Sequence, residues 1–122
     1  MEINEIGKEI LKDGIRRGFF DGDERNLGEM IALIHGELSE ALEADRLDLY
    51  TRVDIKEINN LSDDKFKEEF LKNIKDTFED ELADTIIRLM ELATYKGVDL
   101  EAHITAKNRF NNTRGYRHGK KY

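Results

Sequence analysis

The chain has 122 residues, of which 39% are charged, and its formal net charge at pH 7 is −7. Its apolar runs are only a few residues long, far short of the roughly 20 that a membrane-spanning helix needs, so we expect neither a membrane span nor a secretory signal. Because the chain has no Cys, disulfides and thiolate metal sites are excluded, and we expect a cytoplasmic protein. The absence of Pro and the scarcity of β-branched alternation favour an all-α fold.

Charge is divided unevenly along the chain. Six of the 20 basic residues lie after residue 106, in a segment without any acid, whereas the first 106 residues carry the other 14 bases and all 27 acids. Residues 115–122 are aperiodic and predict an extended basic tail. No shift of composition marks a linker, so we expect a single domain over residues 1–122.

The first two predicted helices follow from apolar residues at helical spacing. Residues 2 to about 20 predict one helix, and residues 26 to about 45 predict another, with Asp23 or Asn26 as its N-cap. The second helix has one continuous apolar stripe, which consists of Leu27, Met30, Ile31, Ile34, Leu38, Ala41 and Leu42.

The second half of the chain predicts further helices. Residues 46–62 indicate a short irregular or partly helical connection, and residues 62 to about 93 predict one long helix or two collinear ones. Gly97 followed by Asp99 is typical of a helix end and a new N-cap, so a last helix should begin near Leu100. Together the patterns predict a bundle of about four to five helices.

Two acidic pairs occupy equivalent places on the two strongest helical patterns. Glu37 and Glu40 are three residues apart, as are Glu81 and Asp84, so each pair spans about 60° around its helix and about 4.5 Å along it. Solvated acids reach this spacing by chance in a chain with 27 acids. Both pairs, however, lie at the edge of an apolar stripe, where converging carboxylates repel one another unless a cation intervenes.

Four carboxylates between two core helices predict a site for a hard divalent cation. All-oxygen ligation favours Mg²⁺, and Mn²⁺ fits the same ligands, because Cys is absent and only three His are present. No phosphate-binding glycine loop, no Ser-His-Asp or Cys-His constellation and no E-x-x-H di-iron pattern can be read from the spacing.

Lys107, Asn111 and Arg114 share nearly one face of the last predicted helix with two apolar residues. This placement predicts that they point inward and bind a polyphosphate held by the acidic cluster, because Arg grips phosphate oxygens bidentately and Lys acts as a point charge. The alternative to phosphate binding is that the helix macrodipole stabilises cations at the helix C-terminus and that the basic tail only aids solubility. Arg88 stands four residues after Asp84, so we expect an ion pair between them rather than a phosphate contact.

These motifs resemble those of the MazG-like, all-α nucleoside triphosphate pyrophosphatases, whose hallmark is E-E-x-x-E followed by E-x-x-D on the next core helix. Here the hallmark reads Gly36-Glu37-Leu38-Ser39-Glu40 and Glu81-Leu82-Ala83-Asp84. The segment Lys107-x-x-x-Asn111-x-x-Arg114-x-Tyr116-Arg117-His118-Gly119 resembles the ending of small single-domain members. Gly36 stands where the family often has a glutamate. The 40 residues between the two acidic motifs exceed the usual separation, so we interpret residues 46–75 as an insertion or an added helical hairpin.

The resemblance implies a homodimer or a dimer of dimers that cleaves the α–β phosphate bond of a nucleotide with Mg²⁺. It implies metal binding and catalysis by Glu37, Glu40, Glu81 and Asp84, and phosphate binding by Lys107, Asn111 and Arg114, with Arg117 and His118 as further candidates. Two alternatives stay open at this point. One is a phosphoribosyl-ATP-type pyrophosphatase, and the other is a non-catalytic helical interaction module with a basic tail, for which the net acidity makes nucleic acid a poor partner.

Overall fold

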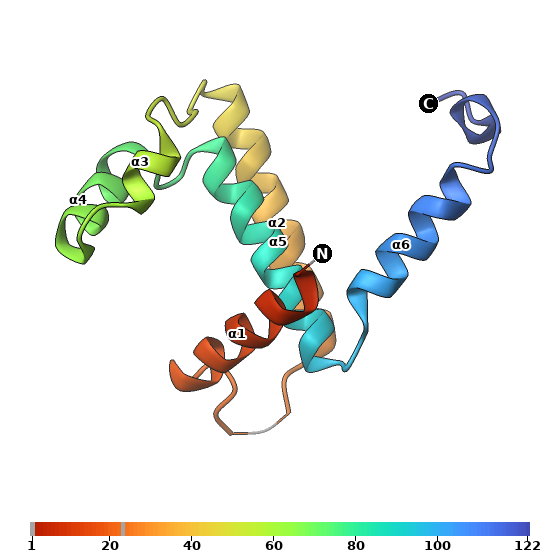
Figure 1. The fold of residues 1–122 in the computed structure, drawn as a ribbon, viewed down its shortest axis with the longest axis horizontal. Helices are drawn as coiled ribbons and strands as arrows, with labels where there is room; N and C mark the ends of the chain where they lie inside the picture. Colours follow the sequence, from red (N-terminus) through yellow and green to blue (C-terminus); the bar gives the residue numbers. More distant parts are fainter. Residues whose placement is uncertain (1, 23) are drawn as a thin grey trace. The chain divides into compact units, whose positions relative to one another are not determined.

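The computed structural model describes residues 2–22 and 24–122, apart from the side chain of His118. Within these residues the protein is all-helical, with six α-helices, a single 3₁₀ helix and no strand (Figure 1). The elements are α1 (Ile3–Arg16), α2 (Leu27–Arg46), α3 (Ile55–Asn59), α4 (Asp63–Asn73), α5 (Phe78–Tyr95), α6 (Leu100–Asn111) and η1 (Tyr116–Gly119). The predicted all-α class is confirmed, and the extra helix beyond the expected four to five is the short α3.

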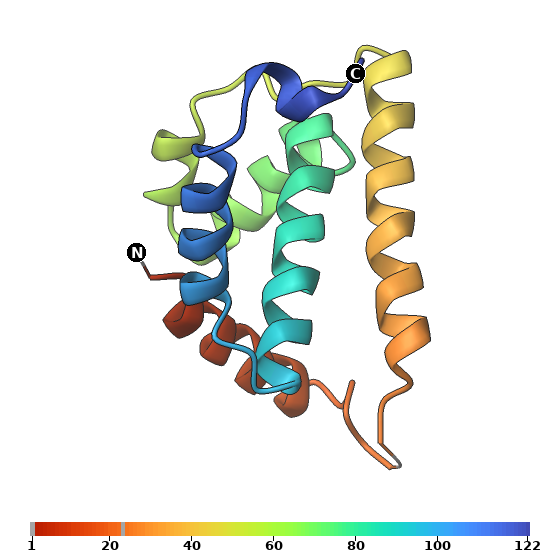
Figure 2. The same ribbon diagram turned by 90° about the vertical axis from the view of Figure 1, so that its right-hand side faces the viewer.

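The helices form two compact units, and α5 contributes to both. The first unit is Glu24–Leu89, and the second combines Met1–Asp23 with Met90–Tyr122. In the first unit, α2 and residues 78–89 of α5 lie side by side and run in opposite directions (Figures 1 and 2). This antiparallel pair carries both acidic motifs.

Local hydrogen bonds set the predicted helix boundaries. The Asn26 side chain accepts a hydrogen bond from the Glu29 amide at 2.9 Å, and the Asp99 side chain accepts one from the Ala102 amide at 3.1 Å. Gly97 has a φ of 70°, the left-handed conformation that ends many helices. Asn26 and Asp99 are thus confirmed as N-caps, and Gly97 is confirmed as the end of a helix. The other predicted cap, Asp23, lies outside the described residues.

The prediction of one long or two collinear helices after residue 62 was wrong. The chain turns between α4 and α5, where Asp76 has a φ of 66° and its amide donates to Asp80 Oδ2 at 2.9 Å, and the two helices point in different directions (Figure 1). The apolar pattern hides this turn because Ile74, which is 4% exposed, is itself buried there.

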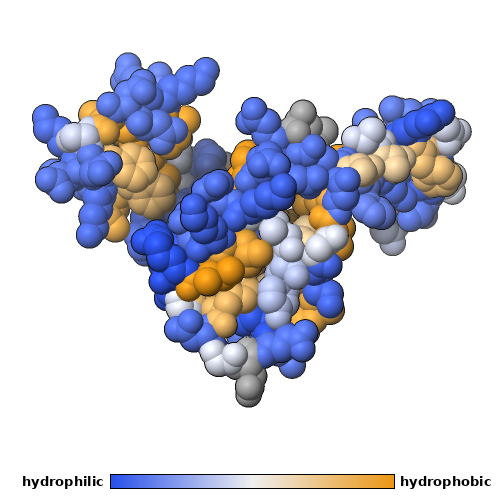
Figure 3. All heavy atoms as spheres, turned by 60° about the horizontal axis from the view of Figure 1, so that its bottom comes forward, coloured by the Kyte–Doolittle hydropathy of each residue, from blue (hydrophilic) through white to orange (hydrophobic). Residues whose placement is uncertain are grey.

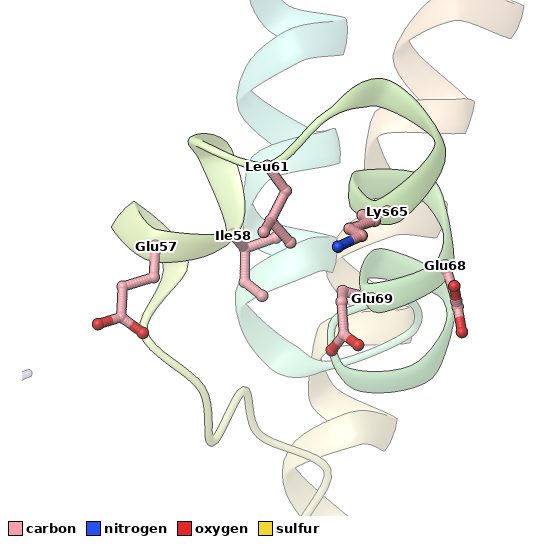
Figure 4. Close-up of a pocket in the computed structure, with 6 residues that line it drawn as sticks. All are labelled: Glu57, Ile58, Leu61, Lys65, Glu68 and Glu69. Carbon is pink, nitrogen blue, oxygen red and sulfur yellow. The ribbon is translucent and has the colours of Figure 1, made fainter.

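The connection predicted to be irregular or partly helical and the tail predicted to be extended both contain short helical elements. Residues 46–75, interpreted as an added hairpin, include α3 and α4, which pack together around a hollow of about 370 Å³. Figure 4 shows the six residues that line this hollow, which are Glu57, Ile58, Leu61, Lys65, Glu68 and Glu69. The tail predicted as extended includes the 3₁₀ helix η1.

The predicted apolar stripe of α2 divides into a buried half and an exposed half. Met30, Ile34, Ala41 and Ala44 of this helix are buried. By contrast, large apolar side chains of the same stripe are 41–52% exposed, namely Leu27, Ile31, Leu38 and Leu42. The buried side of α2 therefore combines Met30 and Ile34 with two alanines, while the other large apolar side chains of the stripe remain on the surface.

The adjacent part of α5 has an equivalent exposed stripe, in which Leu82, Ile86 and Leu89 are 40–53% exposed. On each helix the exposed stripe lies about 100° from the buried side in the same rotational sense. Because the two helices are antiparallel, both stripes lie on one side of the pair and form a single apolar face. Apolar side chains exposed on the protein surface are orange in Figure 3.

In the second unit, α1 packs closely against the end of α5. A Cβ on Gly7 would lie 2.4 Å from Thr94 Oγ1 and 3.2 Å from the Met90 carbonyl oxygen, so a side chain has no room there. At the start of α1, the Asn4 amide donates to Glu101 Oε1 at 2.8 Å, which connects α1 to α6.

None of the helices in the described residues combines the length and the apolar character that crossing a bilayer requires.

Two glycine substitutions should have opposite effects on stability. Gly7→Ala should lower the free energy of unfolding by about 1–3 kcal/mol, because the new methyl group overpacks the contact with α5. Gly36→Ala serves as the matched control, since nothing lies within 4 Å of its Cβ position and the change should add up to about 1 kcal/mol of helix propensity. Urea unfolding measures both effects. A Gly7→Ala variant as stable as the wild type would contradict the close packing.

Candidate metal centre

Glu81 is the most deeply buried of the four predicted carboxylates. It lies one turn into α5 with an exposed fraction of 4%. Its Oε2 atom is inaccessible to solvent and has no hydrogen-bond partner among the described residues. A buried carboxylate oxygen without a donor is unfavourable unless the group is protonated or faces a cation.

Two buried threonines flank Glu81 along the helix but do not satisfy it. The Thr77 hydroxyl donates to the Ile74 carbonyl at 2.7 Å, and the Thr85 hydroxyl donates to the Glu81 backbone carbonyl at 2.8 Å. Each hydroxyl proton is therefore used by the backbone, and neither reaches the Glu81 carboxylate. The buried side of α5 places a carboxylate between these two hydroxyls, and neither hydroxyl donates to its Oε2 atom.

Residues from α2 supply the rest of the acidic cluster. Glu37, Glu40 and Glu81 each place one carboxylate oxygen so that the three atoms lie within 4.8 Å of one another. Glu37 is partly buried and Glu40 is exposed, so the cluster opens from the core towards solvent. Asp84 is not a member of this three-residue group, although it is partly buried and close enough to feel the charges of Glu37 and Glu40.

The environment of the cluster opposes a fully ionised state. Burial, followed by hydrogen bonding to Glu40 and Glu37 and by their negative charges, raises the pKa of Glu81 to about 8. Burial also raises the pKa of Asp84, with the charge of Glu37 as the next cause, while the Arg88 guanidinium acts in the opposite direction. Near neutral pH a proton or a cation must therefore accompany the Glu81 carboxylate.

The donor set fits a hard divalent cation. The three clustered groups offer only carboxylate oxygens, which are the ligands that Mg²⁺ and Mn²⁺ prefer. The unpartnered Oε2 of Glu81 provides an acceptor that no group of the described protein satisfies. Glu37, Glu40 and Glu81 are thus the residues best placed to hold a cation, with Asp84 next to them.

Arg88 has a different partner from the one that the sequence predicts. Its Nε atom donates to Glu37 Oε1 at 2.7 Å, so the ion pair links α5 to α2 instead of joining Arg88 to Asp84 four residues earlier. Helical spacing suggested the local pair, and it could not reveal a partner 51 residues away in the chain. Arg88 is therefore a residue of the centre that sequence reasoning missed.

A second acidic group adjoins the first. Asp76, Asp80 and Glu81 also place carboxylate oxygens within 4.8 Å of one another. Here a side-chain cation is already present, because Lys75 Nζ lies 3.0 Å from Asp76 Oδ2. The Lys75 ammonium neutralises part of the negative charge of this second group. Asp76 and Asp80 are not among the predicted site residues.

The predicted phosphate-binding residues belong to the other unit. Lys107 and Asn111 lie on α6 beside a shallow hollow of about 340 Å³, whereas Arg114 follows the helix, which ends at Asn111. The helix has no fully buried residue. Lys107 is exposed, so the predicted inward orientation is wrong for this residue, whereas Asn111 and Arg114 are partly buried. The Lys107 ammonium and the Arg114 guanidinium instead lie 5.2 Å and 5.6 Å from the centre of the Phe110 ring.

Two observations describe the rest of this basic segment. The Oδ1 atom of Asn111 is inaccessible to solvent and has no hydrogen-bond partner. Arg117, an exposed residue of η1, donates from Nη1 to the Lys121 carbonyl at 2.9 Å and lies over the Tyr116 ring. The side chain of the remaining candidate, His118, lies outside the described part of the protein.

Comparison of the chain with protein-family models, with curated proteins and with solved structures gives no match.

The raised pKa of Glu81 predicts how stability depends on pH. In metal-free protein, the folded state keeps a proton on Glu81 between its ordinary pKa of 4.5 and the folded value of about 8, whereas the unfolded chain releases it. The free energy of unfolding should therefore fall as the pH rises through this window. Glu81→Gln should show a smaller fall. Urea unfolding in the presence of a chelator, between pH 5 and 9, measures both.

Glu43→Gln provides the control, because Glu43 is exposed on α2 and pairs only loosely with Arg46, at 3.9 Å. Its pH profile should follow that of the wild type. Identical profiles for the wild type and Glu81→Gln would show that Glu81 titrates normally.

Proposed function

We propose that this protein is a Mg²⁺-dependent nucleotide pyrophosphohydrolase of the MazG-like kind, which cleaves the α–β phosphate bond of an NTP or dNTP to give a nucleoside monophosphate and pyrophosphate. The observation that carries the proposal is the buried Glu81 carboxylate, with its unpartnered oxygen, next to Glu37 and Glu40. Control of nucleotide pools or removal of non-standard nucleotides is the physiological role that fits this activity.

In this proposal the carboxylates divide the chemical work. Mg²⁺, when bound, would supply the charge that polarises the α-phosphate and lowers the pKa of the attacking water. Glu37, Glu40 and Glu81 hold the ion, and a carboxylate less tightly engaged with it accepts the proton from the attacking water. Asp84 is suited to either task, because it lies beside the cluster and its pKa is raised.

In this proposal the phosphate contacts come from the basic residues on α6 and directly after it. Lys107 and Arg114 neutralise the charge that builds up on the pyrophosphate leaving group, and Asn111 orients it. Support comes from the chemistry of these residues, because the Lys107 and Arg114 cations flank Phe110. The Nδ2 group of a side-chain amide such as that of Asn111 can donate a hydrogen bond to a phosphate oxygen. The Lys107 ammonium lies over an aromatic ring at an exposed site. A cation–π contact there is worth about 0.5–1 kcal/mol, which is weak enough to exchange for a phosphate.

Activity should appear as pyrophosphate release from a panel of NTPs and dNTPs with Mg²⁺, and the panel should include phosphoribosyl-ATP. Glu40→Gln and Asp84→Asn should each lower the rate by about 100-fold or more, the scale of losing one electrostatic stabiliser of a transition state. Product analysis of the panel identifies the substrate.

Glu43→Gln is again the matched control, since it removes an exposed carboxylate from α2 outside the cluster and should leave the rate unchanged. No product from any member of the panel, with Mg²⁺ or Mn²⁺, would refute the proposed activity.

The proposal includes a homo-oligomer, a dimer or a dimer of dimers. Its support is the apolar face formed by Leu27, Ile31, Leu38 and Leu42 of α2 and Leu82, Ile86 and Leu89 of α5. Contiguous exposed apolar surface of this kind usually marks an interface. A second antiparallel pair placed on this face completes a four-helix bundle, in which each pair covers the apolar residues of the other.

Breaking this face should break the oligomer. The wild-type protein should have a solution mass of at least twice the chain mass of 14.2 kDa, and Leu42→Lys should shift it towards the monomer, because the substitution places a charge in the apolar face. Leu71→Lys is the control, since Leu71 is similarly exposed, at 56%, but lies on α4. Analytical ultracentrifugation gives the masses, and a monomeric wild type would contradict the interface.

A further inference from the structure

The ion pair between Arg88 and Glu37 is the one charged contact that joins the two helices of the metal centre in the described residues. Arg88 Nε lies 2.7 Å from Glu37 Oε1, with 38% of the Arg88 side chain and 12% of the Glu37 side chain exposed. A charge-assisted hydrogen bond this short, with one partner mostly removed from water, is stronger than an ordinary surface ion pair. It therefore fixes the Glu37 side chain rather than merely adding charge to the surface.

Arg88 had another carboxylate within reach on its own helix. Asp84 stands four residues earlier and feels the Arg88 charge, yet the hydrogen bond goes to Glu37 of α2. Glu37 is a member of the three-carboxylate cluster, whereas Asp84 is outside it. The guanidinium is thus attached to a cluster carboxylate that comes from the opposite helix.

The geometry leaves Glu37 able to bind a cation. A carboxylate has two oxygens and about four lone-pair positions, and the Arg88 Nε–H uses one of them on Oε1. The remaining positions stay available, and the hydrogen bond restricts the rotamer that presents them. Carboxylates that bind metals are commonly held in this way by an outer hydrogen-bond donor.

We propose that Arg88 is a positioning residue of the metal centre, which holds Glu37 in the orientation required to bind a divalent cation together with Glu40 and Glu81. This inference rests on the proposed function, because it assumes that the carboxylate cluster binds metal. It assigns a role in the metal centre to Arg88, a residue that lies outside both acidic motifs.

The sign of the effect on metal affinity separates positioning from simple electrostatics. Removing a positive charge next to a cation site should tighten cation binding if charge alone matters. Removing the donor that orients a ligand should weaken binding instead, by about 10- to 100-fold. The two roles therefore predict opposite outcomes for the same substitution.

The test measures Mn²⁺ binding to the full-length protein at a fixed pH, from the free Mn²⁺ signal in electron paramagnetic resonance. Arg88→Met keeps most of the apolar stem and should raise the Kd about 10- to 100-fold. Arg88→Lys keeps the charge but lacks the planar Nε donor, and it should also raise the Kd. In a Glu37→Gln background, Arg88→Met should have little further effect, because both substitutions act through one contact.

Arg46→Met is the matched control, since Arg46 also pairs with a glutamate but both side chains are at least 60% exposed and lie outside the cluster. Its Kd should equal that of the wild type. Circular dichroism of each variant checks folding, and Arg88→Lys carries the test if Arg88→Met does not fold.

Unchanged or tighter Mn²⁺ binding by folded Arg88→Met or Arg88→Lys would overturn the positioning role while leaving the metal centre intact. A wild-type protein that binds no Mn²⁺ would overturn the metal centre itself, and this inference with it. The two failures are therefore distinguishable in one titration series.

Discussion

The burial of the Glu81 carboxylate is the constraint on which the first unit depends. Leaving an ionised carboxylate in the interior without a counter-charge costs several kcal/mol, and the adjacent threonine hydroxyls offer no relief because the backbone uses their protons. The group must hold a proton or meet a cation. The convergence of Glu37 and Glu40 on Glu81 strengthens that requirement, and the raised pKa and the proposed metal chemistry are two ways in which it is met.

The same helix pair shows how the site and the outer surface are connected. Ala41 and Ala44 face inward, and such small residues allow two helices to approach closely enough for carboxylates from both to meet. Larger residues such as Leu38 and Leu42 are then left outside, where little of the unit covers them. The helix pair that brings the acids together thus also leaves an exposed apolar surface, which connects the metal-centre proposal with the oligomer proposal.

Errors in the sequence predictions share one physical origin. The helical pattern of apolar residues predicted for 62–93 ran through the turn before α5. Ile74 is buried in that turn, so its position fits a helical repeat although the chain is not helical there. The spacing along α6 placed Lys107 on the same face as apolar residues, and we expected other helices to cover that face. Ile104 on this face is instead 38% exposed. The spacing of residues along one helix shows which of them share a face, but it contains no information about which other segment packs against that face.

By itself, the sequence determined the helical class, the caps at Asn26 and Asp99, and the carboxylates that could converge. These features depend on a period of 3.6 residues and on hydrogen bonds between near neighbours in the chain. Only the tertiary structure decided that Glu81 is the buried member of the cluster, that Arg88 bonds to Glu37 and that half of the α2 stripe stays exposed. Those outcomes depend on how α2 and α5 are rotated against each other, and that rotation is set by packing between residues some 50 positions apart.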